Sequence, residues 1–247
     1  MHRFGSVYIG TSGWYYQHWY GKFYPTDLAK KELLSYYCRH FDTVELNNSF
    51  YSLPSENAVN CWRDNTGKEF LFSVKASRLI THYKRLKNSH NVLQSFLKRM
   101  SLLENKLGPV LFQLPSTFSK DITTLKKFIT VLPDKLQKVI EFREKSWICN
   151  EVFKVLKKYN VAFCTVSMPN FPVVFEKTAD FSYMRFHGSE ALYGSCYSEE
   201  ELCWFAKKIQ HFLLKDKSAT YIYFNNDNNA YAVHNALYLK QLLFDTD

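Results

Sequence analysis

The chain has 247 residues, a length that fits one TIM-type barrel, and its 46% hydrophobic share is ample for a buried core. The formal net charge of +9 favours anionic partners, either small molecules or nucleic acid. No apolar run approaches the roughly 18 residues of a membrane span, and the first ten residues lack the apolar segment of a signal peptide. We therefore expect a cytoplasmic protein that does not associate with membranes.

The six cysteines show neither a metal site nor a redox pair. They contain no C-x-x-C motif and no zinc-finger spacing. Reduced thiols in a cytosolic protein are the simplest interpretation. The sequence gives no indication of the oligomeric state.

Eight short apolar runs have the character of β-strands. In chain order they are VYIGTSGW, TVELNNSFY, FLFSVKAS, VLFQLP, VIEFRE, VAFCTV, FSYMRFHG and TYIYFNND. Helix-like segments lie between them. Eight alternations of strand and helix predict an α/β protein, a (β/α)8 TIM-type barrel that forms a single domain over residues 1–247.

The segments between the runs carry helix signals. Asp121 and Asn150 are predicted N-caps, and Ser198 forms a capping box with Glu201 ahead of a helix. The segment 167–179 contains two prolines and is predicted to be a loop. Apolar residues at helical spacing, together with these signals, predict further helices at 26–40, 56–64, 88–107, 122–132, 151–159 and 229–243.

Nearly every run ends on ionisable or amide side chains, VYIGTSGW carries the hydroxyls of Thr11 and Ser12, and only VAFCTV lacks such polar residues. Because side chains alternate along a strand, Glu45 and Asn47 share one face of their strand, and Arg185 and His187 share one face of theirs. Barrels of this type collect their chemistry at the C-terminal ends of the strands. The predicted substrate-binding residues are Thr11, Ser12, Trp14, Asn47, Tyr51, Lys75, Gln113, Arg143, Arg185, Asn225, Asn226 and Asp227.

The charged members of this set predict an anionic ligand. Lys75, Arg143 and Arg185 are three fixed cations, and arginine binds phosphate or carboxylate in bidentate fashion. We predict a site for a small phosphate- or carboxylate-bearing molecule. Trp14, Tyr15, Trp19 and Tyr51 are expected to form its wall.

Two carboxylates permit acid–base catalysis. Glu45 and Glu141 are the predicted catalytic acid and base, and His187 is a candidate for moving protons near neutral pH. A Schiff base on Lys75 is disfavoured, because nearby acids oppose the lowered pKa that it requires. The sequence therefore predicts an enzyme without resolving hydrolase, isomerase or lyase chemistry.

Other interpretations stay open. The inward polar residues could form a structural lattice with the ion pairs Glu45–Lys75 and Glu141–Arg185. The stretch 82–87 (HYKRLK), together with Trp14, Tyr15, Trp19 and Tyr20, could bind nucleic acid, and a non-catalytic ligand sensor or scaffold is a third alternative.

The sequence contains no Walker sequence and no G-x-G-x-x-G motif, so it does not predict a nucleotide cofactor. A divalent metal on Glu45, Glu141, His187 and Asp227 is disfavoured by the neighbouring cations, so no cofactor or metal is predicted.

Seven stretches between residues 8 and 243 resemble the DUF72, or YecE-like, family. They are IGTSGWYYQHWYGKFYP, FDTVELNNSFYSLP, FLFSVKASRLITHYKRL, LGPVLFQLPSTF, VIEFREKSW, ADFSYMRFHG and YFNNDNNAYAVHNAL. The resemblance implies a TIM-like barrel and attaches no catalytic role to any residue. Glu144 stands where the family form E-F-R-H-x-S-W has histidine, so no proton-transfer role is implied there. Ala230 replaces a usual glycine.

Overall fold

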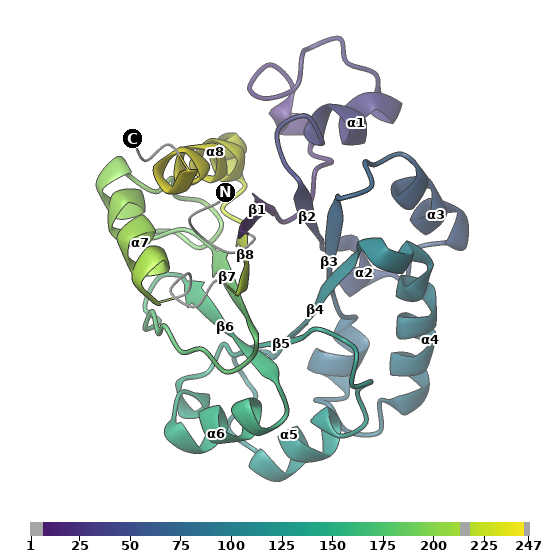
Figure 1. Cartoon of the computed structure of the whole chain (residues 1–247), viewed down its shortest axis with the longest axis vertical. Coiled ribbons are helices and arrows are strands. Elements are labelled where there is room, and N and C mark those ends of the chain that lie inside the picture. The colour runs from purple at the N-terminus through teal and green to yellow at the C-terminus, as the bar shows by residue number, and fades with distance from the viewer. Residues whose placement is uncertain (1–6, 213–217, 245–247) are drawn as a thin grey trace. The chain divides into compact units, whose positions relative to one another are not determined.

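Eight strands form the sheet, and they lie at the eight runs that the sequence predicts. The computed structural model describes residues 7–212 and 218–244. The strands are β1 (Val7–Thr11), β2 (Thr43–Leu46), β3 (Leu71–Lys75), β4 (Leu107–Gln113), β5 (Lys138–Glu141), β6 (Val161–Ser167), β7 (Phe181–Phe186) and β8 (Ala219–Phe224). Their order in the sheet is β1-β8-β7-β6-β5-β4-β3-β2 (Figure 1).

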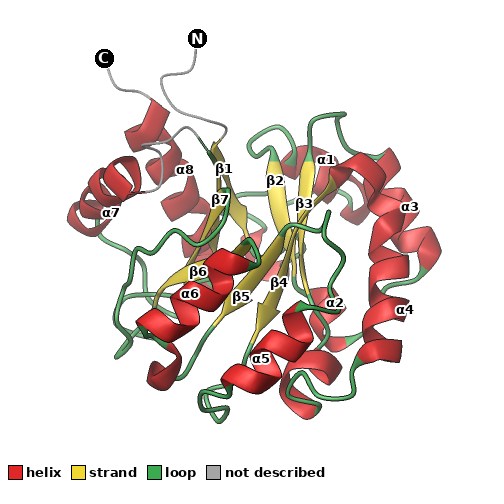
Figure 2. Cartoon of the chain, turned by 60° about the horizontal axis from the view of Figure 1, so that its bottom comes forward, coloured by secondary structure: helices red, strands yellow, loops and turns green. Residues whose placement is uncertain are grey.

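Helices separate most consecutive strands, as Figure 2 shows in red. The α-helices are α1 (Leu33–Tyr37), α2 (Asn48–Tyr51), α3 (Glu56–Asp64), α4 (His90–Met100), α5 (Ile122–Ile129), α6 (Asn150–Lys158), α7 (Glu199–Phe212) and α8 (Tyr231–Phe244). Short 3₁₀ turns are η1 (Gln17–Trp19), η2 (Lys30–Glu32), η4 (Ser101–Lys106), η5 (Lys145–Trp147) and η6 (Asn228–Ala230), and η3 (Leu79–Tyr83) is a π-helical turn. None of the described helices is both long and apolar enough to cross a bilayer.

Residue contacts group the chain into two compact units. Among the described residues, the first unit comprises 7–45, 165–177, 181–212 and 218–244, and the second comprises Leu46–Cys164 and Thr178–Asp180. The expectation of a single domain over residues 1–247 stays a prediction, and each unit is described by itself.

Parallel pairing organises both units. In the first unit β8 pairs with β1 and with β7, which places Phe186 opposite Phe224, and these two rings stack with centroids 4.4 Å apart. In the second unit β3, β4, β5 and β6 pair in succession, which places Gln113 opposite Glu141. Strands that are buried on both faces are typical of parallel α/β sheets, and β2, β5, β6 and β7 are buried along their whole length.

Two helix predictions were wrong in detail. The helix expected at 26–40 is reduced to η2 and α1, because residues 26–32 have no buried side chain and a short amphipathic helix depends on tertiary packing. Asn150 is the first residue of α6 rather than its cap, and Cys149 takes the cap position without a side-chain hydrogen bond. The loop predicted at 167–179 is confirmed after Ser167, the last residue of β6.

The predicted capping box at the start of α7 is confirmed. Glu201 N donates to Ser198 Oγ at 3.2 Å, and Ser198 N donates to the Glu201 carboxylate at 2.8 Å. We expect Ser198→Ala to lower the free energy of unfolding by about 1 kcal/mol, the usual loss when an N-cap side chain is removed. Urea titration followed by circular dichroism measures this loss. An unchanged midpoint would show that the box contributes nothing to stability.

Candidate functional site

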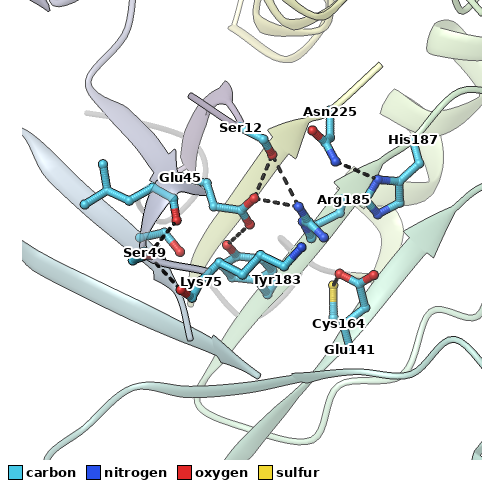
Figure 3. A network of polar contacts seen from close by, with 12 residues as sticks. Ser12, Glu45, Ser49, Lys75, Glu141, Cys164, Tyr183, Arg185, His187 and Asn225 are labelled. Atoms are coloured by element: carbon cyan, nitrogen blue, oxygen red, sulfur yellow. Dashed lines mark hydrogen bonds and ion pairs between the residues drawn. The ribbon is translucent and has the colours of Figure 1, made fainter. Parts of the chain in front are cut away.

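In the first unit, Glu45 lies at the centre of a buried hydrogen-bond cluster (Figure 3). Arg185 Nη2 and Ser12 Oγ each donate to Glu45 Oε1 at 2.7 Å. Tyr183 OH donates to Glu45 Oε2 at 2.6 Å. Both Glu45 and Arg185 are 0% exposed. These four residues, here called the Glu45 cluster, bring together three predicted site positions and one tyrosine that the sequence reasoning did not select.

The strand pattern explains this convergence. Tyr183 and Arg185 are two residues apart on β7, so both side chains lie on the same face of that strand. Burial, and then the charge of Glu45, raise the pKa of Tyr183 well above its ordinary value, so its hydroxyl stays a proton donor. A covered carboxylate that accepts three hydrogen bonds is well suited to holding Arg185 in place.

Thr11 is also committed to contacts inside the first unit. Its backbone N and its Oγ1 each lie 2.9 Å from the Tyr37 hydroxyl, and Oγ1 donates to Gly13 O at 2.7 Å. Tyr37 OH also lies 3.1 Å from Thr43 O. The predicted ligand contact of Thr11 stays a prediction, and the structure gives this side chain a role in joining β1 to β2.

His187 and Asn225 meet at the ends of β7 and β8. The Asn225 amide nitrogen lies 3.3 Å from His187 Nδ1, and His187 is fully buried. Because an amide NH₂ only donates, this contact gives His187 Nδ1 the acceptor role. Asn226 is buried beside them, and its amide donates to Ser195 O at 3.0 Å and to Asn235 Oδ1 at 2.8 Å.

Asp227 binds the loop that follows β1. Trp19 Nε1 donates to Asp227 Oδ1 at 2.7 Å, and His18 Nε2 lies 3.0 Å from Oδ2 and 2.7 Å from the backbone O. Burial raises the pKa of Asp227 to about 6, and His18 and Trp19 counteract part of that rise. The sequence reasoning missed His18, which lies in a loop without strand or helix periodicity.

The predicted aromatic wall is only partly available to a ligand. Trp19 is 0% exposed, so its predicted roles as a pocket wall and as a base-stacking surface were wrong. It is enclosed by neighbouring rings, among them Tyr16 at 4.9 Å and Phe23 at 5.6 Å between centroids. Trp14 is half-buried and Tyr15 is exposed.

In the second unit, Glu141 is the last residue of β5 and forms an ion pair with Arg143. Arg143 Nε donates to Glu141 Oε1. Cys164 Sγ lies 4.0 Å from Glu141 Oε2, as Figure 3 shows. Glu141 is 0% exposed, whereas the Arg143 side chain keeps 8% of its surface exposed. Gln113, opposite Glu141 in the sheet, is also 8% exposed, and its side chain makes no hydrogen bond within the described residues.

Lys75 ends β3 in the same unit. Its Nζ lies 4.1 Å from the centre of the Phe50 ring, and Ser49 Oγ donates to Lys75 O at 2.7 Å, which joins α2 to β3. The rings of His82 and Phe50 pack in a T shape, with centroids 5.0 Å apart. Burial, followed by the charges of Lys75 and Arg143, lowers the pKa of His82, so both cations act on one imidazole.

These residues of the second unit form what is here called the Lys75 cluster, namely Lys75, Gln113, Glu141, Arg143 and His82. Their elements β3, β4 and β5 are adjacent parallel strands, so their C-terminal ends meet at one edge. Lys75, Arg143 and Glu141 together carry one net positive charge. The two cations each keep about 8% of their surface exposed while the carboxylate is fully covered, which favours an anion as ligand.

The remaining predicted site residues of the second unit lie on α2 and at its start. Asn47 occupies the cap position of α2, and its side chain makes no cap hydrogen bond. Tyr51 is 66% exposed, and the Arg78 guanidinium lies 5.5 Å from its ring centre. No group of three His, Cys, Asp or Glu residues in the described part of the chain is placed to hold a metal ion.

Both buried glutamates form ion pairs with arginines. Glu45 pairs with Arg185 inside the first unit, and Glu141 pairs with Arg143 inside the second. The pairs Glu45–Lys75 and Glu141–Arg185 stay predictions. Each carboxylate is thus matched by an arginine of its own unit.

The family model described as "Protein of unknown function DUF72" matches residues 8–246. The chain belongs to the DUF72 family. The UPF0759 protein YecE of Escherichia coli K12 is 33% identical over 138 residues, which are 56% of this chain and 48% of YecE, so the match spans about half of that relative. The UPF0759 protein YunF of Bacillus subtilis is 25% identical over 96% of this chain and 94% of its own.

Solved DUF72 structures share the fold. A Thermotoga maritima family member superposes with a TM-score of 0.87 at 30% identity, over 96% of this chain and 99% of that one. An Enterococcus faecalis member gives a TM-score of 0.83 at 21% identity, over 98% and 96%, which shows the fold alone. Together with the eight strands, this likeness confirms the (β/α)8 TIM-type barrel.

Proposed function

We propose that this DUF72 protein is an enzyme that binds a small phosphate- or carboxylate-bearing molecule at the C-terminal ends of β3, β4 and β5. The Lys75 cluster carries the proposal, because Lys75 and Arg143 keep exposed surface while Glu141 is covered. Arginine held from one side by a carboxylate presents a fixed guanidinium plane, which suits bidentate binding of an anion.

The contacts suggest distinct roles within the cluster. Lys75 and Arg143 bind the anion, and Gln113 supplies an amide that has no partner within the described residues. Glu141 fixes Arg143 through Nε. In this proposal Glu141 is a positioning residue, and its predicted role as a catalytic base is replaced by that of an anchor.

The Glu45 cluster supports the proposal differently. Glu45 and Arg185 have no surface open to solvent, and they join β2 and β7 inside the first unit. We infer that they hold the ends of these two strands in place. The three donors around Glu45 favour this role over acid–base catalysis.

We expect calorimetry to detect binding of inorganic phosphate or sulfate over chloride at equal ionic strength. Lys75→Gln and Arg143→Gln should each weaken binding about 10- to 150-fold, since a hydrogen bond to a charged group contributes about 1.5–3 kcal/mol. Lys135→Gln, which removes the same charge from an exposed loop, is the matched control and should leave affinity unchanged.

The same variants test turnover. Sugar phosphates and nucleotides that compete with sulfate are incubated with the protein and followed by NMR. Product formation that Lys75→Gln abolishes and Lys135→Gln spares would support the enzyme. Specific binding without product from any competing ligand would favour the sensor alternative. Binding only of oligonucleotides, with a steep loss in added salt, would contradict the proposal and favour the nucleic-acid alternative.

A further inference from the structure

A π-helical turn places His82 in the Lys75 cluster. The turn η3 spans Leu79–Tyr83, begins four residues after β3, and is closed by a bond from Lys84 N to Leu79 O at 3.1 Å. Within the turn Thr81 is fully buried, His82 is half-buried and Tyr83 is exposed. Single π-turns are rare and occur frequently at functional sites, because the widened backbone redirects one side chain.

The contacts of His82 leave one ring nitrogen for a ligand. Nδ1 lies 2.9 Å from Thr81 Oγ1, and the imidazole packs against the Phe50 ring in a T shape. Nε2 makes no hydrogen bond to any residue within 7–212 or 218–244. The imidazole is therefore held on one side by Thr81 and Phe50, while Nε2 has no partner in the described protein.

Three cationic side chains affect the pKa of this imidazole. Lys75 of β3, Arg143 after β5 and Arg78 at the start of the turn all lower the pKa of His82, and burial lowers it most. Glu141 of β5 acts in the opposite direction and is outweighed. His82 is therefore neutral at neutral pH, which is the state that accepts a proton.

We propose that His82 is the general base of this site, and that its Nε2 takes a proton from an anionic substrate bound to Lys75 and Arg143. One proton moves from the substrate to Nε2, and the bonding electron pair remains on the substrate. The inference rests on the proposed function and adds the proton acceptor to it. The bound anion neutralises the cations, so substrate binding makes His82 a stronger base.

NMR of protein labelled with ¹³C in histidine measures this coupling in the full chain. Sulfate is the probe, because it does not titrate near neutral pH. We expect saturating sulfate to raise the pKa of His82, with chloride at equal ionic strength as the control. Without sulfate, Lys75→Gln and Arg143→Gln should each raise the pKa of His82, and Glu141→Gln should lower it. His234, exposed on α8, provides the reference signal.

Calorimetry gives a second readout. Because coupling is reciprocal, sulfate should bind more tightly as pH falls through the titration of His82, and His82→Gln should remove that pH dependence while retaining binding. Sulfate binding with an unmoved His82 titration would overturn the role of His82 and leave the proposed function standing. Absence of any binding of inorganic phosphate or sulfate would overturn both. A rise in the pKa of His82 on sulfate binding that is absent in Arg143→Gln would support the proposal.

Discussion

Glu45→Ala is expected to lower the free energy of unfolding by about 3–5 kcal/mol, because it removes a buried carboxylate that pairs with Arg185 and accepts hydrogen bonds from Ser12 and Tyr183. For a chain of this length, each kcal/mol shifts the melting temperature by about 2–4 °C. The variant should therefore melt at least about 6 °C lower. Scanning calorimetry and urea unfolding measure the loss. Glu190→Ala, on the exposed loop after β7, is the matched control.

A double-mutant cycle measures how strongly the contributions of Glu45 and Arg185 to stability depend on each other. Glu45→Leu with Arg185→Met removes both charges and keeps apolar volume, so the double variant should lose less than the sum of the two single variants. The hydroxyls of Ser12 and Tyr183 still lose an acceptor, so some destabilisation should remain. Strict additivity would show that Glu45 and Arg185 do not depend on each other.

The sequence predicted the strands well because their signal is local. Each of the eight runs became a strand, and alternation along β7 accounts for Tyr183 and Arg185 lying on one face. Alternation does not identify the partner across the sheet. The choice of Arg185 as the partner of Glu45 depends on where the ends of β2 and β7 lie in three dimensions, which spacing along the chain does not specify.

The missed residues lie where periodicity is absent. His18 and Trp19 belong to a loop with a single 3₁₀ turn, so no pattern shows that Trp19 is buried and binds Asp227. His82 begins the basic stretch HYKRLK, which suggests a charged surface. The π-turn directs His82 to Phe50 instead, and a π-turn leaves no signature in residue spacing.

Gly10→Ala is expected to destabilise the protein by about 3 kcal/mol, at the upper end of the usual cost of overpacking. A Cβ at this position would lie 2.3 Å from Thr43 O and 3.1 Å from the Tyr37 hydroxyl. A backbone carbonyl in a buried strand cannot turn aside as a flexible side chain would, so β1 and β2 would have to separate. Urea unfolding of the variant measures the cost.

Gly67→Ala is the matched control, since a Cβ there meets no atom within 4 Å and the backbone is not left-handed. It should be neutral or stabilise by about 0.4–1 kcal/mol through the unfolded state. Thr43 precedes Glu45 by two residues, and Ser12 follows Gly10 by two. Separating β1 from β2 should therefore also weaken the bond from Ser12 to Glu45. If Gly10→Ala and Gly67→Ala unfolded at the same urea concentration, the close approach of these strands would not be what holds the Glu45 cluster together.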